Sequence, residues 1–462
     1  MTTATVDERR SPGLLGIASW VFFDWAAQPY FTLITTFVFA PYFATRLAAT
    51  PVEGQSLWGY ATAAAGLVIA LLSPVLGAIA DAAGRRKPWI LLFSAMLIVG
   101  SLGLWFAVPG VDGALALALV AFAVGTIGVE FATVFTNAMM PDLVSQERLG
   151  KLSGIGWATG YAGGLVSLVI ALGLLAANPD TGRTLFGFAP LFGLDPATNA
   201  GDRASGPLTA IWYAVFVLPL FLFTPDTPRR LPLGAAIRRG VADMIETIRR
   251  LGYHGNIGRF LVANLVYQDG LVALFAFGGI YAAGTFGWSA IELGLFGILL
   301  TITGTAGALV GGWIDDKIGP RPIIAGSLVV LIVACLAIVS IDAGHVLFVL
   351  PVVPPAPGDG LFVTVDERAY LVIGAAIGAV AGPLQASSRT LLARLAPREK
   401  MTQCFGLFAL SGKVTSFMGP LAVALLTALA QSQRIGISAI VGFFVAGAVL
   451  IRRVVSPGRR VA

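Results

Sequence analysis

The sequence predicts an all-α polytopic membrane protein, with about twelve transmembrane helices in two pseudo-symmetric six-helix bundles. Hydrophobic residues make up 57% of its 462 residues and charged residues only 12%, about half the charged share of a soluble domain. The hydrophobic residues are gathered in long runs, and a helix needs about 20 such residues to cross a bilayer. A polar segment from Thr224 to Gly258 separates six runs from six.

The first six runs are expected to form the N-terminal bundle, residues 1–224. They lie near residues 14–45, 57–80, 88–109, 113–138, 152–177 and 207–224. The run that begins at Leu14 is much longer than the apolar core of a signal peptide and lacks a small-residue cleavage site, so we interpret it as the first span.

The other six runs are expected to form the C-terminal bundle, residues 257–462. They lie near residues 257–283, 289–314, 322–341, 369–393, 403–428 and 434–453. Residues 225–256 form the linker, in which six arginines are interspersed with apolar residues. We expect Gly234 to Leu251 to form an amphipathic helix on the membrane surface.

The basic residues predict the orientation of the spans. Of the 30 Lys and Arg residues, 23 fall on one side when the loops are assigned alternately to the two sides. Cytoplasmic loops collect basic residues, so we expect both termini in the cytoplasm and a bacterial inner membrane as the location. The net charge of +6 is explained by these loops, and we expect no nucleic-acid partner.

Residues typical of enzymes and metal sites are scarce. Cys335 and Cys404 lie in separate apolar runs, and His254 and His345 have no clustered ligand companions. A catalytic triad, a zinc-ligand spacing and a phosphate-binding loop are all missing from the sequence. We therefore expect neither enzyme activity nor a cofactor or metal, and we expect a monomer. A receptor that does not transport remains an alternative.

A short motif occurs twice, once in each half. The loop after the second run reads Gly77-x-x-x-Asp81-x-x-Gly84-Arg85-Arg86. A looser copy after the eighth run contains Gly311, Asp315, Lys317, Gly319 and Arg321. This pattern resembles the loop motif of the major facilitator superfamily. The resemblance implies the major-facilitator fold and secondary transport by alternating access, with the solute bound near mid-membrane between the halves.

Further motifs resemble the vacuole effluxer family of autophagy and its bacterial relatives. These motifs are Phe23-Asp24-Trp25-Ala-Ala-Gln28-Pro-Tyr30, Asn137-Ala-x-x-Pro141, Ser153-Gly-x-Gly156, Tyr267-Gln-Asp269-Gly270 and Gln385-Ala-x-Ser388-Arg389. Eukaryotic members of that family are associated with amino-acid export from vacuoles. One departure, Ala27-Gln28-Pro29 where Asn-Ser-x is usual, places a proline inside the first span.

The run Gly84-Arg-Arg-Lys-Pro-Trp89 is also similar to a loop of the sugar–cation symporter family. This similarity implies glycoside or pentoside transport as the alternative to amino acids.

Two carboxylates are expected deep in the membrane. Asp24 lies about ten residues, or about 15 Å, into the first span. Asp269 lies about twelve residues into the seventh span, which the duplication pairs with the first. Charged groups at this depth are costly and usually functional, so both are candidates for a central binding or coupling site. Alternatively, each carboxylate pairs with a nearby cation.

Three further charges have two interpretations each. Glu130 suits a proton-coupling group because burial favours a neutral carboxyl, but it could equally be a structural partner of Lys413 or Arg389. Lys413 would bind an anionic group of the solute or neutralise a carboxylate. Arg389 would bind solute or extend to the lipid headgroups.

Polar neighbours complete the predicted site. Gln28 is four residues from Asp24 and shares its helix face. Asn264 and Gln268 have the same spacing, and Tyr30, Tyr161 and Tyr267 could supply hydroxyl groups. Opposite charges and amides together suit a zwitterion or another small polar solute, with H+ or Na+ as the coupling ion. A drug exporter would need fewer opposing charges.

The paired loops have a different predicted role. The candidate cytoplasmic gate consists of Asp81, Arg85, Arg86, Asp315 and Arg321. We expect these residues to pair across the two halves, or with helix ends, in one conformational state only, which would bias the transport cycle. The alternative is a basic loop with no role beyond orientation.

Overall fold

The prediction of an all-α polytopic protein is confirmed. The structure, a computed structural model, describes residues 13–49, 51–178, 181–251, 255–286, 288, 290–341, 345–352, 361–412, 415–430 and 432–455. Within these residues, ten helices are long and apolar enough to cross a membrane. The first and eleventh predicted spans are each divided into helical pieces.

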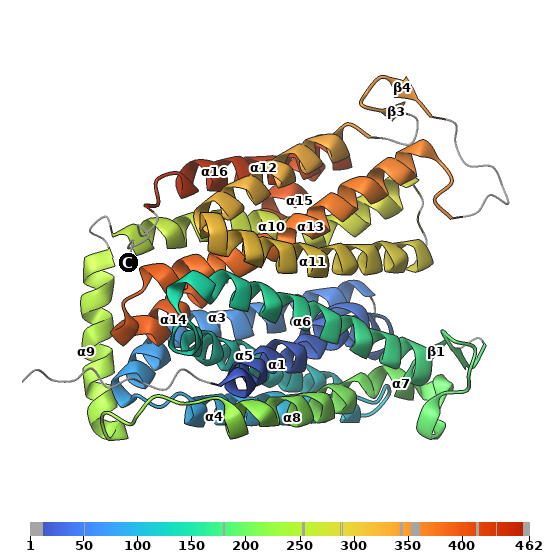
Figure 1. Cartoon of the computed structure of the whole chain (residues 1–462). Coiled ribbons are helices and arrows are strands. Elements are labelled where there is room, and N and C mark those ends of the chain that lie inside the picture. Colours follow the sequence, from blue (N-terminus) through green and yellow to red (C-terminus); the bar gives the residue numbers. More distant parts are fainter. Residues whose placement is uncertain are drawn as a thin grey trace, which may run out of the picture.

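The spans of the first half are α1 (Leu14–Pro29) continued by the π-helix η1 (Tyr30–Phe37), α3 (Pro51–Ala83), α4 (Lys87–Gly103), α5 (Ala114–Leu143), α6 (Leu149–Ile170) and α8 (Ser205–Phe223). The spans of the second half are α10 (Asn256–Phe286), α11 (Ala290–Ile318), α12 (Pro320–Val339), α13 (Val365–Leu395), α14 (Met401–Ser411) with α15 (Met418–Ala430), and α16 (Gln433–Ile451). The two halves form two layers, with the first half below the second in Figure 1.

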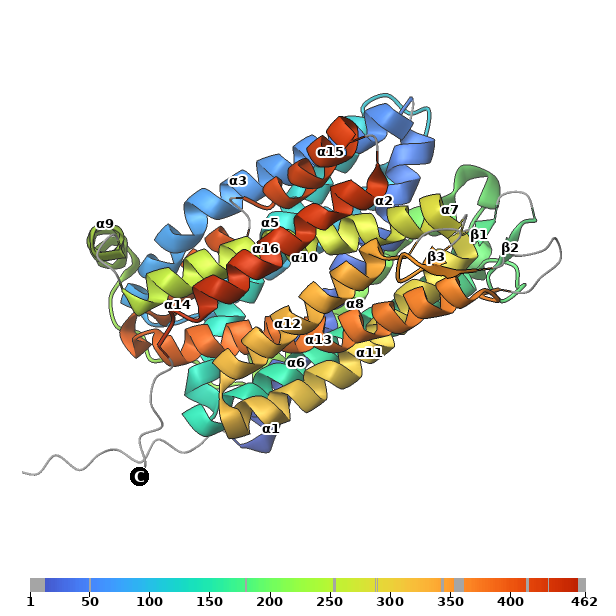
Figure 2. The same ribbon diagram turned by 90° about the horizontal axis from the view of Figure 1, so that it is seen from above.

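Short elements connect the spans. Three are α-helices, α2 (Phe39–Tyr42), α7 (Ala200–Arg203) and α9 (Leu233–Leu251). Two antiparallel hairpins, β1 (Ala177–Asn178) with β2 (Arg183–Thr184) and β3 (His345–Val346) with β4 (Leu350–Pro351), lie in the long loops after α6 and α12. Helix α9 lies across the ends of the spans and is seen end-on in Figure 2.

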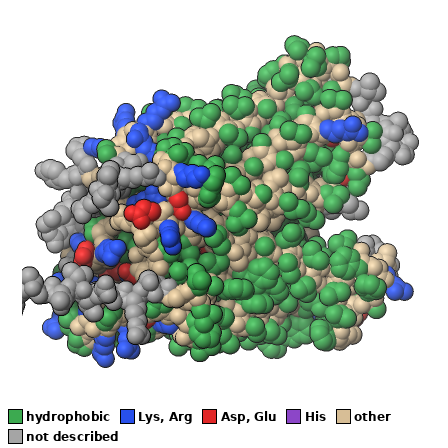
Figure 3. All heavy atoms as spheres, viewed as in Figure 1, with side chains coloured by type: hydrophobic (Ala, Val, Ile, Leu, Met, Phe, Trp, Pro, Cys, Tyr) green, Lys and Arg blue, Asp and Glu red, His purple; other side chains and the backbone are tan. Residues whose placement is uncertain are grey.

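One end of the bundle carries most of the visible charge. We call it the charged end and define it by the loop Gly84–Arg86, the start of α6 and the end of α16. Lys, Arg, Asp and Glu side chains gather there, whereas hydrophobic and other uncharged groups cover most of the rest of the view (Figure 3). Both described chain ends belong to it. Thr224 at the end of α8 donates to the Gly16 carbonyl at 3.0 Å, and Asn256 bonds to Val455.

Proline explains the change within the first span. Pro29 lacks an N–H group and its ring crowds the preceding turn, so the regular α-helical bonding cannot continue through it. The chain changes to a π-helix at Tyr30, and such segments often lie at functional sites. The prediction of a proline inside this span thus has a direct structural consequence.

The eleventh span, predicted near residues 403–428, is interrupted. The helix ends at Ser411 and resumes at Met418. The resumed helix packs closely on the seventh span, because a Cβ at Gly419 would collide with the main-chain carbonyl of Asp269. Interrupted spans are typical of binding sites in transporters.

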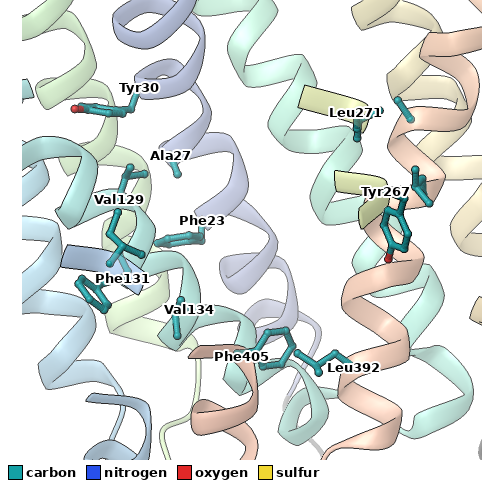
Figure 4. Close-up of a cluster of buried hydrophobic side chains, with 14 of the residues drawn as sticks. Phe23, Ala27, Tyr30, Val129, Phe131, Val134, Tyr267, Leu271, Leu392 and Phe405 are labelled. Carbon is teal, nitrogen blue, oxygen red and sulfur yellow. The ribbon is translucent and has the colours of Figure 1, made fainter. Parts of the chain in front are cut away.

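The two halves meet mainly through α3 with α14 and α6 with α11. Each half also has its own buried apolar side chains, such as Phe23 and Phe131 in the first and Leu271 in the second (Figure 4). The buried apolar residues of the two halves belong to one cluster, and the polar groups described next lie between the halves.

Candidate functional site between the two halves

Arg389 of α13 is the polar centre of the interface between the halves. It is only 4% exposed, and its guanidinium donates four hydrogen bonds, all to the first half. Nη1 bonds to Asp24 Oδ2 at 3.1 Å and to Asn137 Oδ1 at 3.0 Å. Nε bonds to Ser153 Oγ at 2.8 Å, and Nη2 to the Ser153 carbonyl at 2.7 Å. This network satisfies a buried charge that would otherwise be costly.

Aromatic and small residues complete the surroundings of Arg389. The Trp20 and Trp157 ring centroids lie 5.4 Å and 6.0 Å from its Cζ atom, within reach of a cation–π interaction. Gly156 lies directly against the ion pair. A Cβ there would be 2.9 Å from Nη2 of Arg389 and still closer to Asp24 Oδ2. Only glycine leaves room for the pair at this position.

The structure excludes one of the two interpretations of Arg389, and its role in solute binding stays a prediction. Its side chain points into the interface and is buried, so the expectation that it extends to the headgroups is wrong. Asp24 pairs with this cation, as the alternative interpretation of that carboxylate allowed. The ion pair and its hydrogen-bond partners come from four of the quoted sequence motifs, in spans one, four, five and ten. Sequence analysis quoted Asn137, Ser153 and Gly156 in these motifs but did not include them in the site.

Asp269 lies elsewhere, against the interrupted span. It is 1% exposed and faces Thr415 between α14 and α15, yet no ordinary hydrogen bond joins them. Asp269 Oδ1 and Thr415 Oγ1 are both buried without a hydrogen-bond partner among the described residues. Asn264 donates to Ser411 Oγ at 2.9 Å, at the end of α14. Asp24 and Asp269 thus have different surroundings.

Two of the predicted hydroxyl groups are already bonded inside the halves. Tyr30 is fully buried and donates to the Phe122 carbonyl at 2.8 Å, beside Thr126 Oγ1 at 3.1 Å. The Tyr267 hydroxyl bonds to Ser388 Oγ at 2.7 Å.

Other predicted polar residues are partly accessible. Gln28, Glu130 and Gln268 are half-buried, and Glu130 lies close enough to Tyr30 to interact with it electrostatically. Lys413, the remaining predicted site residue, lies outside the described residues.

A small cavity of about 70 Å³ also lies between the halves. It is lined by Tyr161 of α6 and by residues of α10, α11 and α13 that include Thr301 and Gly304. Beside it, Gln385 donates to the Tyr161 hydroxyl at 3.2 Å, across the interface. Tyr161 was predicted as a possible source of a hydroxyl group, whereas Gln385 was quoted only as part of a motif.

At the charged end, Asp81 binds the first turn of α14. Its carboxylate accepts hydrogen bonds from the Thr402 and Gln403 N–H groups at 3.1 and 2.8 Å. A carboxylate at a helix N-terminus is stabilised by the free N–H groups and by the helix dipole. Arg86 is buried beside it and bonds to Asp142 at 2.6 Å and Thr402 Oγ1 at 3.1 Å.

The second copy of the loop motif makes the equivalent contact from the second half to the first, through Asp316. Its carboxylate accepts hydrogen bonds from the Gly150 and Lys151 N–H groups at 2.8 and 3.1 Å, in the first turn of α6. Asp315 instead bonds to Ser387 at 2.6 Å and pairs with Arg394 at 3.3 Å, inside its own half.

The predicted register of the second copy is therefore off by one residue. The spacing Gly-x-x-x-Asp-x-x-Gly fits Gly312, Asp316 and Gly319 and could have revealed this. The structure agrees, because Gly84 and Gly319 both have positive φ, at 94° and 91°. A Cβ at Gly77 would lie 2.6 Å from the Thr402 carbonyl, and one at Gly312 would lie 2.7 Å from the Gly150 carbonyl.

Two cations predicted for the gate do not reach across the halves. Arg85 is exposed, and Arg321 donates to the Arg452 carbonyl at 2.6 Å within the second half. Arg394, which sequence analysis did not select, occupies the position beside the second carboxylate at 3.6 Å from Asp316.

Comparison with known proteins identifies the family of the chain. The family described as "Vacuole effluxer Atg22 like" matches residues 43–460. The chain belongs to this family. The predicted resemblance to the effluxers and to the major facilitator superfamily is confirmed, and the chain is a multi-pass membrane protein of the transporter type.

Relatives extend over most or part of the chain. The MFS-type transporter YxiO of Bacillus subtilis is 22% identical over 94% of this chain and 93% of its own. Autophagy-related protein 22 of Yarrowia lipolytica is 23% identical over 60% of this chain, which spans about half of that relative (45%). The human organic anion transporter MFSD10 shares the fold, with a TM-score of 0.68 at 16% identity over 95% and 99% of the two chains.

Proposed function

We propose that this transporter moves amino acids or similar small polar solutes, coupled to protons, as a monomer that works by alternating access. The family's description as vacuole effluxers supports solute movement. The charged end would face the cytoplasm, because basic residues accumulate on that side of a membrane. Both termini would then be cytoplasmic, and a bacterial inner membrane would be the location.

The ion pair between Asp24 and Arg389 carries this proposal. It joins the halves at a buried position, with 3.1 Å between the charged atoms. A proton that binds Asp24 would remove one charge of the pair and weaken the contact between α1 and α13. The halves could then separate at the charged end. A protonation step would in this way be linked to the change in access.

The charges between the halves favour a zwitterionic solute. Arg389 could receive a solute carboxylate in place of Asp24, because a guanidinium binds carboxylates in a planar, two-point geometry. A buried carboxylate at Asp269 and the Tyr161–Gln385 pair beside the cavity could bind an ammonium group and other polar atoms. Gln28, Glu130, Gln268 and Lys413 stay candidates for the same role.

A flux measurement in proteoliposomes tests the proposal. Purified protein would be reconstituted with an imposed pH gradient, and uptake of labelled amino acids, peptides, glycosides and pentosides would be compared. We expect uptake of at least one amino acid that a protonophore abolishes. Uptake of sugars alone would establish the sugar–cation alternative, and no gradient-dependent uptake of any solute would refute coupled transport.

A further inference from the structure

The two adjacent arginines of the first loop have different environments. Arg86 is buried in the contact between the halves, as described above. Arg85 is exposed, and the described part of the chain provides it with neither a hydrogen bond nor an ion pair. The contacts of the cytoplasmic gate therefore do not explain the role of Arg85 in the motif.

A cavity of about 500 Å³ lies beside Arg85, between the charged-end termini of α4 and α8. Arg85 and Lys87 line it from one side, and Asp226 of the linker from another. The rest of the wall is largely apolar and includes Pro88, Leu91 and Phe221. The cavity thus combines a cationic part with a hydrophobic part.

Hydrogen bonds between the linker and the loop hold this cavity open. Asp226 accepts hydrogen bonds from the Arg86, Lys87 and Thr227 N–H groups at 2.9, 3.2 and 2.9 Å. Arg230 N donates to the Ala83 carbonyl at 2.9 Å, and the Thr227 hydroxyl bonds to the Gly84 carbonyl. The Asp226 carboxylate is therefore held by main-chain N–H groups and keeps its negative charge, so the cavity wall carries two cations and one anion.

Lys87 and Arg85 both have N–H donors left to bind a ligand. Lys87 Nζ uses one hydrogen on the Phe221 carbonyl at 2.8 Å, which leaves two for a ligand. The Arg85 guanidinium has all five N–H donors available. Arg229 and Arg230 are exposed in the adjoining linker and add positive charge. An anionic group would be attracted to this site.

The hydrophobic part points to a lipid as the source of that anion. Leu91 is 59% exposed and Leu222 is 69% exposed, on the outer surfaces of α4 and α8. Such surfaces face acyl chains in a membrane, and basic pockets between spans near the surface are suited to anionic headgroups. A free phosphate ion would contact the cations alone and leave the apolar wall unused.

We propose that this cavity binds the headgroup of an anionic phospholipid. The phosphate lies between Arg85 and Lys87, and the acyl chains run along Leu91 and Phe221. The site belongs to the outer surface of the first half and does not depend on which solute is transported. It assigns the two arginines of the motif to different tasks, Arg86 to the gate and Arg85 to the lipid.

Native mass spectrometry of the full-length protein tests this site. Delipidated protein in detergent would be titrated with phosphatidylglycerol, and with phosphatidylcholine as the zwitterionic comparison. We expect tighter binding of phosphatidylglycerol, weakened about fivefold by Arg85→Gln and about 25-fold by Arg85→Gln with Lys87→Gln. Arg453→Gln removes an equally exposed cation at the charged end of the second half and should bind as the wild type does.

Two results would overturn the proposal. Unchanged phosphatidylglycerol binding by Arg85→Gln, or an equal loss in Arg453→Gln, would mean that the lipid is held by general surface charge. Displacement of the lipid by millimolar inorganic phosphate would indicate a free-anion site instead. Arg85 is exposed and its substitution leaves the packing intact, so this variant decides the matter even if Lys87→Gln fails to fold.

Discussion

Asp24 and Arg389 are 365 residues apart in the chain, yet Oδ2 of the first lies 3.1 Å from Nη1 of the second. Arg389 is bonded only to the first half at this contact, although it belongs to the second. Any motion that separates α13 from α1, α5 and α6 must therefore break the whole network. Removing one partner of a buried ion pair costs about 3–5 kcal/mol, because the other charge stays buried.

Substitution of Asp24 should separate coupling from solute exchange. In Asp24→Asn the side-chain shape is kept but no proton can be bound or released. We expect uphill uptake driven by a pH gradient to fall to background, while exchange of solute between equal concentrations persists. Asp112→Asn, in an exposed loop, is the control and should retain both activities. Full pH-driven uptake by Asp24→Asn would remove this residue from the coupling mechanism.

A pair of glycines on α6 provides a steric test. Gly156→Ala should disrupt the ion pair, since the added methyl group would collide with Asp24 Oδ2. At Gly160, one turn away, a Cβ would meet Asp24 Cβ and its carbonyl at 3.4 Å, which is ordinary contact. We expect at least a tenfold loss of uptake, equal to about 1.4 kcal/mol, only in Gly156→Ala. Equal activity of the two variants would contradict the close packing.

The reciprocal contacts at the charged end should control access from that side. Cys404, buried in α14 next to the residues that Asp81 binds, can report opening in a Cys335→Ser background. We expect faster maleimide labelling of Cys404 in Asp316→Asn, by about fivefold if the carboxylate contributes about 1 kcal/mol at the helix terminus.

Asp315→Asn is the matched comparison, because that side chain bonds only within its own half. Its labelling rate should stay closer to that of the parent protein. The reverse order of rates for the two variants would favour the register first predicted from sequence.

Two tyrosines should differ in what their hydroxyl groups do. Tyr30→Phe loses bonds to the Phe122 carbonyl and Thr126 inside the first half, so we expect a stability loss of about 1 kcal/mol with unchanged solute affinity. Tyr161→Phe loses its bond to Gln385 across the interface and should change the apparent affinity for solute. Thermal unfolding and concentration-dependent uptake separate the two effects, and a shifted affinity in Tyr30→Phe would speak against a purely structural role.

Asp269 should show a trade-off between stability and function. A buried oxygen without a partner is destabilising, so Asp269→Asn should raise the unfolding temperature while it abolishes pH-driven uptake. Thermal unfolding in detergent and uptake in proteoliposomes would be measured on one preparation. A lower unfolding temperature would mean that the carboxylate is stabilised in the folded protein after all.

Much of the fold follows from the sequence for simple reasons. A span must be long and apolar, and a polar linker must separate two sets of six, so the spans and the linker helix are visible in composition alone. The interruption in the eleventh span is only partly visible in this way. Gly412 to Phe417 include the polar residues Lys413, Thr415 and Ser416, but these lie between two apolar stretches and were counted as part of the span. Beyond the break, α15 packs against the main chain of Asp269.

The site was harder to predict, because depth along a helix does not fix direction around the interface. Asp24 and Asp269 lie at similar positions in the first and seventh spans, but one faces Arg389 and the other faces Thr415. Asn137 belongs to one of the quoted motifs but carries no charge, so it was not predicted as a site residue, although it accepts a hydrogen bond from the same guanidinium nitrogen as Asp24. Neutral partners of a buried charge can be identified only once the helices are placed together.

The contacts of Asp81 and Asp316 have one more consequence. Each carboxylate binds main-chain N–H groups at the start of a helix in the opposite half. Every residue except proline offers such a group, so Lys151, whose side chain is exposed, can diverge while its bond to Asp316 survives. Gly150 cannot, because a Cβ there would lie 2.7 Å from Asp315 Cβ, and Thr402 also accepts a hydrogen bond from Arg86 through its hydroxyl group. Selection at this end should therefore be uneven, strict on the two carboxylates, their glycines, Gly150 and Thr402 and permissive at position 151, even between relatives with few identical residues.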